Sequence, residues 1–278
     1  MPVNDQRGYA LKPNAHYLFW GLHGTLPEPV HYQINGQGLR EDGLVLTEIP
    51  ENRLRIATLG DSEVFGWSVN STQTFQHLLE KMDDRLEVIN MGAPGYNAEN
   101  VAWQGEIMLE KYACHAVLYW VNPNDFFRSK SLVSLRVFQS FRSALVFQSY
   151  FFFERLKENR EKRTRYSLVQ VERMKTGLLQ LSNICDSKKI PLFLAFSKPR
   201  DYDVLIKIPE LKRAFKPESV LFIDSIMKMH PRVDGHLSAA GHGELASFLY
   251  REMAMPLFSK MESIKTASQP AGSIHSVQ

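Results

Sequence analysis

The chain has 278 residues, of which 44% are hydrophobic and 23% charged, and its formal net charge is +3. These values are typical of a globular protein, and the length fits one α/β domain with terminal extensions better than two full domains. So small a net charge gives no support for nucleic acid binding, and the sequence has no zinc-ligand spacing, Walker loop or dinucleotide-binding glycine pattern.

Residues 1–50 are rich in Pro, Gly and Asn and contain short strand-like pieces such as VHYQI. We expect them to form an N-terminal extension packed on the main domain. The first residues have no apolar signal core, and the longest nearly apolar stretch, SALVFQSYFFF, is too short to span a bilayer. As written, the chain is expected in the cytoplasm, whereas an anchor upstream of it would make the protein periplasmic or membrane-anchored.

Residues 51–258 alternate between apolar runs and amphipathic stretches, and we expect them to form one domain. The runs that predict buried strands are RLRIATL (53–59), LEVIN (86–90), AVLYWV (116–121), PLFLAF (191–196) and VLFID (220–224). Helices are predicted over residues 71–82, 97–112 and 166–189, and from about Ser238 to Met253. Strands that are apolar on both faces and alternate with helices predict a three-layer α/β/α fold with about five parallel strands.

Residues 128–165 interrupt this alternation with ten Lys or Arg and three Asp or Glu, a net charge of +7 that leaves −4 for the rest of the chain. One interpretation is a protruding helical hairpin with a solvated charged face. The other is a cap over the active site, or a surface attracted to an anionic lipid or polymer. Residues 259–278 are expected to form a disordered tail, and Cys114 and Cys185 are expected to be core thiols.

Gly60-Asp61-Ser62 follows the first predicted strand, at the edge of the sheet where ligands of parallel sheets bind. At this point Ser62 fits either a turn residue or a nucleophile. A serine hydroxyl becomes a good nucleophile only when a base removes its proton, and acyl transfer also needs hydrogen-bond donors for the oxyanion.

Three later segments carry residues of these types: INMGAPGYN (89–97), VNPND (121–125) and VDGHLSAAGH (233–242). Gly95 can present its backbone N–H to a ligand, and Asn124 can offer a side-chain amide in a loop that Asp125 braces. Each of these two segments also fits an ordinary turn. In the third segment, Asp234 and His236 are two residues apart, so the carboxylate can position the imidazole.

Together the four segments resemble the SGNH (GDSL-type) hydrolase family over about residues 50–255. The resemblance implies that Ser62 is the nucleophile and donates its backbone N–H to the oxyanion. It implies Gly95 and Asn124 as the other two oxyanion donors. The base would be His236, oriented by Asp234.

Two positions depart from the pattern of this family. Asn122 stands where glycine is usual, so the loop around Asn124 is expected to differ in shape. The short Asp-x-His spacing resembles the branch that includes periplasmic polysaccharide O-acetylation proteins, and it leaves His242, expected within the last helix, as the alternative base. The preceding segment YQINGQGLRED is also similar to the lead-in of many bacterial members.

The resemblance implies a flavodoxin-like domain that acts as a serine esterase or acyl-transferring enzyme. The acyl group, often acetyl, would come from a carbohydrate or lipid ester, and the Ser-His-Asp mechanism requires no metal or organic cofactor. The choice between carbohydrate deacylase, acetyltransferase and lysophospholipase stays open. A non-catalytic binding or assembly protein with the same fold is the alternative. No nucleic acid partner is expected, and the sequence does not indicate an oligomeric state.

Overall fold

The computed structural model describes residues 10–21, 26, 28–127 and 166–268 of the chain. The predicted insert at residues 128–165 lies outside these ranges, as do residues 269–278 of the predicted tail. What the sequence predicts for these two segments therefore stays a prediction.

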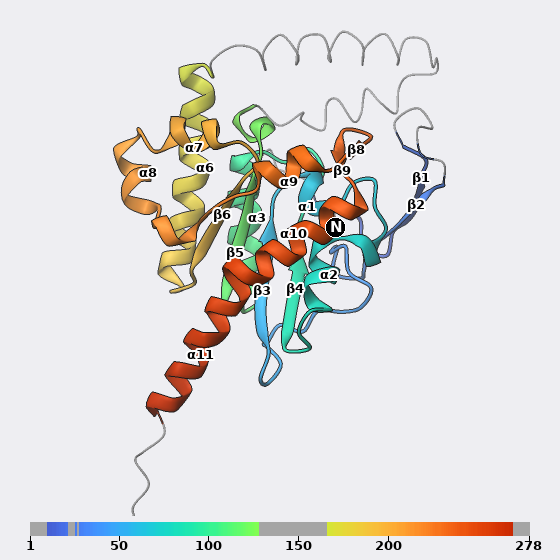
Figure 1. Ribbon diagram of the computed structural model, residues 1–278, viewed down its shortest axis with the longest axis horizontal. Coiled ribbons are helices and arrows are strands. Elements are labelled where there is room, and N and C mark those ends of the chain that lie inside the picture. Colours follow the sequence, from blue (N-terminus) through green and yellow to red (C-terminus); the bar gives the residue numbers. More distant parts are fainter. Residues whose placement is uncertain (1–9, 22–25, 27, 128–165, 269–278) are drawn as a thin grey trace, which may run out of the picture.

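A five-stranded parallel sheet forms the centre of the molecule (Figure 1). From one edge to the other its strands are β4 (Leu86–Asn90), β3 (Leu54–Leu59), β5 (Ala116–Val121), β6 (Leu192–Phe196) and β7 (Val220–Phe222). Numbered along the chain, this order is 2-1-3-4-5, the order of flavodoxin-like sheets. Every residue of β3 and β5 is buried, because helices cover both faces of the sheet.

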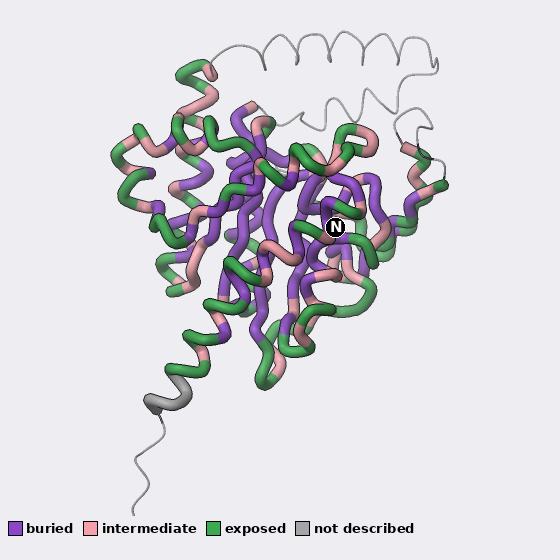
Figure 2. The backbone as a smooth tube through the Cα atoms, in the orientation of Figure 1, coloured by how far each residue is buried: buried purple, intermediate pink, exposed green. Residues whose placement is uncertain are grey.

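The helices form the two outer layers. In chain order they are α1 (Ser62–Phe65), α2 (Phe75–Glu80), α3 (Ala98–Lys111), α6 (Leu168–Ser187), α7 (Pro199–Leu205), α8 (Pro209–Ala214), α9 (Asp224–Met229), α10 (Ala239–Leu249) and α11 (Met255–Ser268). Successive strand residues point to opposite faces. Thus Ala57 and Leu59 of β3 belong to a core shared with α3 and α6, whereas Leu54 and Ile56 belong to one shared with α2, α9 and α10. Figure 2 shows the buried positions running through the sheet between these layers. The predicted three-layer α/β/α fold is confirmed.

Capping side chains set the start of several predicted helices. The side chain of Asn97 accepts a hydrogen bond from the Asn100 N–H at 3.0 Å and opens α3. The predicted helix over residues 71–82 is divided, because a short 3-10 helix ends at Gln73 and the Thr74 side chain then caps α2. At the other end of the chain, α10 passes through a π-helical turn into α11, which continues to Ser268, past the predicted domain boundary at residue 258.

Part of the N-terminal extension packs beside α1. Strands β1 (His16–Phe19) and β2 (Val30–Gln33) pair in antiparallel fashion. From β2, the ring of Tyr32 lies 5.2 Å from that of Phe65 and 6.0 Å from that of Trp67, measured between centroids. The extension therefore supports the turn that follows β3.

The described residues on either side of the predicted insert, Phe127 and Tyr166, lie close together. The rings of Phe126 and Tyr166 stack in parallel with centroids 3.9 Å apart, and the Phe127 ring lies 6.2 Å from that of Tyr166. The Asn97 side chain donates a hydrogen bond to the Phe127 carbonyl at 2.9 Å, and the Tyr166 hydroxyl donates one to Asp201 at 2.8 Å. These contacts hold the described residues on either side of the predicted insert next to each other.

Cys114 and Cys185 are both buried and unbridged, which confirms their prediction as core thiols. Within the described ranges, no helix combines the length and the apolar character needed to cross a membrane.

Candidate active site

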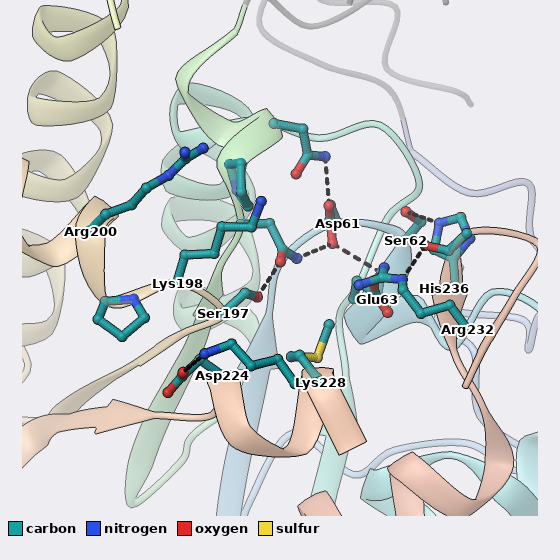
Figure 3. Close-up of a pocket in the computed structure, with 16 residues that line it drawn as sticks. Asp61, Ser62, Glu63, Ser197, Lys198, Arg200, Asp224, Lys228, Arg232 and His236 are labelled. Carbon is teal, nitrogen blue, oxygen red and sulfur yellow. Dashed lines mark hydrogen bonds and ion pairs between the residues drawn. The ribbon is translucent and has the colours of Figure 1, made fainter. Parts of the chain in front are cut away.

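The carboxyl ends of β3, β5, β6 and β7 meet at one edge of the sheet, where a cleft of about 840 Å³ opens. The cleft is lined by Asp61, Ser62, Glu63, Asn122, Pro123, Asn124, Ser197, Lys198, Pro199, Arg200, Asp224, Met227, Lys228, Arg232, Gly235 and His236 (Figure 3). Three of the residues expected in the site, Ser62, Asn124 and His236, are therefore brought together.

Ser62 is the first residue of α1, a single helical turn that starts directly after β3. The Asp61 side chain caps this turn by accepting a hydrogen bond from the Glu63 N–H at 2.9 Å. The turn ends at Gly66 with φ 82°, a conformation that glycine adopts at little cost. From the lead-in segment, the buried Arg40 donates hydrogen bonds at 2.6 Å to the carbonyls of Gly66 and Val69. Both ends of the turn that carries Ser62 are thus held by side chains.

A second contact fixes α1 against the loop after β4. A Cβ atom added to Gly92 would lie 2.2 Å from the backbone nitrogen of Phe65, so only glycine allows this approach. The Gly92 N–H donates to the Asn90 side chain at 3.0 Å. Gly95 adopts φ 79° in the same loop, and it is not among the described residues that line the cleft. Its expected part in the oxyanion hole therefore stays a prediction.

The side chains of Ser62 and His236 form a direct hydrogen bond, with 2.8 Å between Oγ and Nε2 (Figure 3). The other imidazole nitrogen, Nδ1, lies 2.9 Å from the backbone carbonyl oxygen of Asp234. A carbonyl oxygen can only accept, so Nδ1 carries the proton and Nε2 is left to accept from the serine hydroxyl. This tautomer is the one in which the imidazole can take the hydroxyl proton.

Asp234 orients the imidazole through its main chain in this structure. Asp234 and Gly235, with φ 54° and 83°, form the two-residue turn between β8 (Arg232–Val233) and β9 (His236–Leu237). This turn places the Asp234 carbonyl oxygen against Nδ1, and the expected role of the carboxylate stays a prediction. The carboxylate accepts a hydrogen bond from the Trp67 indole at 3.4 Å. Asp-Gly suits such a turn because both central residues need positive φ.

The carboxylate of Asp61 also joins α1 to the loop after β5. It accepts hydrogen bonds from the side-chain amides of Asn122 at 3.0 Å and Asn124 at 2.6 Å. The Asn122 amide oxygen in turn accepts from the hydroxyl of Ser197, which accepts from the Trp120 indole at 2.6 Å. Asn122, at the position where glycine was expected, thus links the carboxyl ends of β3, β5 and β6.

Asp125 braces the Asn124 loop, as predicted. Its carboxylate accepts hydrogen bonds from the Asn122 N–H at 2.8 Å and from the Tyr119 hydroxyl at 2.9 Å. Burial, reinforced by the charge of Asp61, raises the pKa of the Asp125 carboxyl well above its usual range. This residue acts behind the cleft wall, because it is fully buried.

His242, the alternative base, lies inside α10 and is completely buried. Its Nδ1 accepts a hydrogen bond from the Phe75 N–H at 3.2 Å, and its ring stacks on that of Phe75. Burial lowers the pKa of His242 to about 3, so the imidazole stays neutral at ordinary pH. Its contacts are those of a core residue.

Sequence reasoning missed several residues of the cleft. Glu63, Ser197 and Arg232 contribute to its wall and to its hydrogen bonds. Ser197 does follow a predicted strand directly, so its position at the carboxyl end of β6 was a usable signal. Nothing in the local sequence connects Glu63 with Arg232, since their contact depends on how the last hairpin folds back.

No protein-family model matches the sequence, and no curated protein matches it either. Among solved structures, the chain is similar to a protein ascribed to the lipolytic G-D-S-L family from Desulfitobacterium hafniense DCB-2, with 14% identity, 72% of this chain and 100% of that chain covered and a TM-score of 0.49. It is also similar to TesA (13% identity, 73% and 99% covered, TM-score 0.48) and to the psychrotrophic esterase EstA from Pseudoalteromonas sp. (14%, 73% and 98%, 0.48). At this level of similarity, the chemistry of the site has to be inferred from its own geometry.

Proposed function

We propose that this chain is a serine esterase or acyltransferase of the SGNH type, with Ser62 as nucleophile and His236 as general base. The observation that supports this most directly is the 2.8 Å hydrogen bond between Ser62 Oγ and His236 Nε2, two residues that line the cleft. Nucleophile and base within hydrogen-bond reach, with the base oriented by a third group, is the arrangement that activates a serine hydroxyl.

In the first step, Ser62 Oγ attacks the ester carbonyl carbon while its proton passes to His236 Nε2. The carbonyl π electrons move to oxygen and form a tetrahedral oxyanion. When this intermediate collapses, the alcohol leaves and takes the proton from Nε2, and the acyl group stays on Oγ. Water, or the hydroxyl of an acceptor, then attacks the acyl-enzyme in the same way and releases the acid or a new ester.

The oxyanion would be stabilised by donors around Ser62. The Asn124 amide nitrogen donates one hydrogen to Asp61 at 2.6 Å, and its second hydrogen can point into the cleft. We infer that Asp61 holds this amide in place so that little reorganisation is needed when charge develops. The backbone N–H groups of Ser62 and Gly95 are the other proposed donors.

The chemistry of the cleft favours a polar substrate. Among the described side chains that line it, only those of Pro123, Pro199 and Met227 are apolar. The charged ones are Lys198, Arg200, Lys228 and Arg232 together with Asp61, Glu63 and Asp224. Sites for long acyl chains need extensive apolar walls. We therefore propose a short acyl group, such as acetyl, carried by a carbohydrate or another polyhydroxy alcohol.

Labelling with a fluorophosphonate probe tests the proposal, because such probes react only with an activated serine. Wild-type protein should label at Ser62 and hydrolyse small acetyl esters. Ser62→Ala should fold, fail to label and lose about 10⁴-fold in turnover. A panel of esters with acyl chains of increasing length, run with and without a polyol acceptor, then separates hydrolase from transferase. If folded wild-type protein neither labels nor turns over any ester, the chain is a non-catalytic binding protein instead.

A further inference from the structure

Glu63 is the immediate neighbour of Ser62, and its side chain is buried. One carboxylate oxygen accepts a hydrogen bond from a terminal nitrogen of Arg232, and the other accepts from the backbone N–H of Leu237 at 3.0 Å. Arg232 lies in β8, the first strand of the hairpin, and Figure 3 shows its side chain extending toward Glu63. The residue next to the nucleophile therefore binds the hairpin that bears His236 at two points.

Arg232 adds a third bond within the hairpin. Its Nε donates to the Gly235 carbonyl at 2.7 Å. Consequently Gly235 and Leu237, the residues before and after His236, both form hydrogen bonds with the Glu63–Arg232 ion pair. Each strand of this hairpin has only two residues, and so short a pair is marginally stable alone. An external anchor is needed to keep the imidazole within hydrogen-bond reach of Ser62.

We propose that Glu63 is a positioning residue, which holds the His236 hairpin against α1 through Arg232 and Leu237 and thereby fixes the Ser62–His236 geometry. This inference rests on the proposed function. Glu63 acts through the backbone on either side of His236 rather than on the reacting atoms. Displacements of about 1 Å between reacting groups can lower a rate by roughly 10².

A carboxylate suits this position because its two oxygens can each accept a bond, one from Arg232 on β8 and one from Leu237 on β9. Burial raises the pKa of Glu63, and the charge of Arg232 opposes that rise. The Glu63 side chain is 5% exposed and that of Arg232 41%, so removal of Arg232 would leave a buried carboxylate without its ion-pair partner. Loss of either residue should therefore loosen the hairpin.

The test compares Glu63→Gln, Glu63→Ala and Arg232→Lys with Glu110→Gln. The last variant removes a carboxylate from an exposed ion pair with Lys188 and serves as the matched control. Gln keeps an acceptor for the Leu237 N–H, so kcat for a small ester should fall about tenfold. Ala removes both bonds, and kcat should fall about 10²-fold. KM should change less than about twofold in the Glu63 variants, since both carboxylate oxygens of Glu63 are engaged by the hairpin.

The second readout is independent of catalysis. Long-range ¹H–¹⁵N NMR spectra of the histidine rings, recorded where the imidazole is neutral, report which nitrogen carries the proton. Wild type and Glu110→Gln should show His236 with the proton on Nδ1, whereas Glu63→Ala should show a mixture of both tautomers. Glu63→Gln and Arg232→Lys replace the alanine variant if that variant does not fold. Both should show a smaller population of the second His236 tautomer than is expected for Glu63→Ala.

Folded Glu63 variants with wild-type kcat and a wild-type tautomer would overturn the positioning role. A loss expressed in KM alone would also overturn it, because that would make Glu63 a substrate contact. If wild-type protein has no esterase or labelling activity, the proposed function fails, and the NMR comparison still decides whether Glu63 orders the hairpin.

Discussion

A single carboxylate organises the centre of the site. Asp61 caps the helical turn that starts with Ser62, and it binds the amides of Asn122 and Asn124 from the neighbouring loop. The sequence pattern accounts for the first task, because aspartate directly before a helix is a common N-cap. The second task depends on β3 and β5 being adjacent in the sheet, which local sequence does not show.

The two histidines of the last segment should behave differently when replaced. His236→Ala removes the proposed base, so turnover of a small ester should fall about 10⁴-fold, as for Ser62→Ala. His242→Ala removes the acceptor of the buried Phe75 N–H, which should lower the free energy of unfolding by about 1–3 kcal/mol. Activity of the folded His242 variant should stay within a few-fold of wild type. The opposite ranking of the two activities would reassign the base to His242.

The Glu41 carboxyl makes the stability of the fold depend on pH. It accepts a hydrogen bond from the Asn90 N–H at 2.6 Å, and although part of the residue reaches solvent, burial of the carboxyl raises its pKa from 4.5 to about 8, with Glu80, Asp42 and Glu87 adding to the rise. The folded state thus holds this proton more tightly than the unfolded state does. The stability contributed is present below pH 4.5 and is lost as the pH rises through the window up to about 8.

We therefore expect Glu41→Gln to flatten the pH dependence of thermal unfolding. The midpoint temperature of wild type should fall further between about pH 5 and pH 8 than that of the variant, with the variant the more stable at the upper end. Replacement of the exposed Glu244 by Gln is the control. It should leave the fall in midpoint temperature between about pH 5 and pH 8 the same as in wild type. Parallel wild-type and Glu41→Gln curves would show that this carboxyl does not control the effect.

Among the elements, the parallel strands were the easiest to predict. Runs such as LRIATL are mostly apolar and are buried at every position, and each predicted run overlaps one of the five strands. The short helices α7, α8 and α9 were missed because segments of six or seven residues show too little periodicity. The β8–β9 hairpin was missed for a similar reason. Its two-residue strands carry no alternating pattern, and yet they decide how Asp234 meets the imidazole.

The crossing of α3 and α6 depends on a glycine. A Cβ atom added to Gly177 would lie 2.4 Å from the carbonyl carbon of Ala98, so Gly177→Ala must push α6 away from α3. Overpacking of this kind costs about 1–3 kcal/mol. Gly243 offers a matched control, because nothing lies within 4 Å of an added Cβ there. Gly243→Ala should stabilise α10 by about 0.5–1 kcal/mol. Denaturant unfolding measures the change in the free energy of unfolding for each variant. Changes of the same sign in Gly177→Ala and Gly243→Ala would contradict this prediction.

At the scale of the whole molecule, residues 128–165 are the segment we expect to select the substrate. They follow the Asn124 loop, and their +7 charge contrasts with −4 for the rest of the chain. Because Phe127 and Tyr166 lie side by side, a short linker can join them without disturbing the sheet. We expect a variant with a Gly/Ser linker in place of this segment to hydrolyse a small acetyl ester within about tenfold of wild type, and to lose its preference among larger substrates.

Salt provides the second arm of that experiment. If the segment attracts anionic ligands, the preference of wild type should weaken as the screening length falls from about 10 Å at 0.1 M to about 3 Å at 1 M salt. The linker variant should show little salt dependence. Loss of small-ester turnover in a folded linker variant would instead make the segment part of the catalytic scaffold.

The hydrogen bond between Ser62 and His236 joins residues 174 positions apart in the chain. Closure of so long a loop carries a large entropic cost, and contacts of this range form late in folding. During synthesis, the proposed nucleophile Ser62 and its turn emerge well before the hairpin that carries the proposed base. A chain still being translated would therefore carry an unactivated serine, and esterase activity would appear only once the last hairpin has docked. Recovery of activity during refolding would then report the completion of the fold rather than the formation of the sheet.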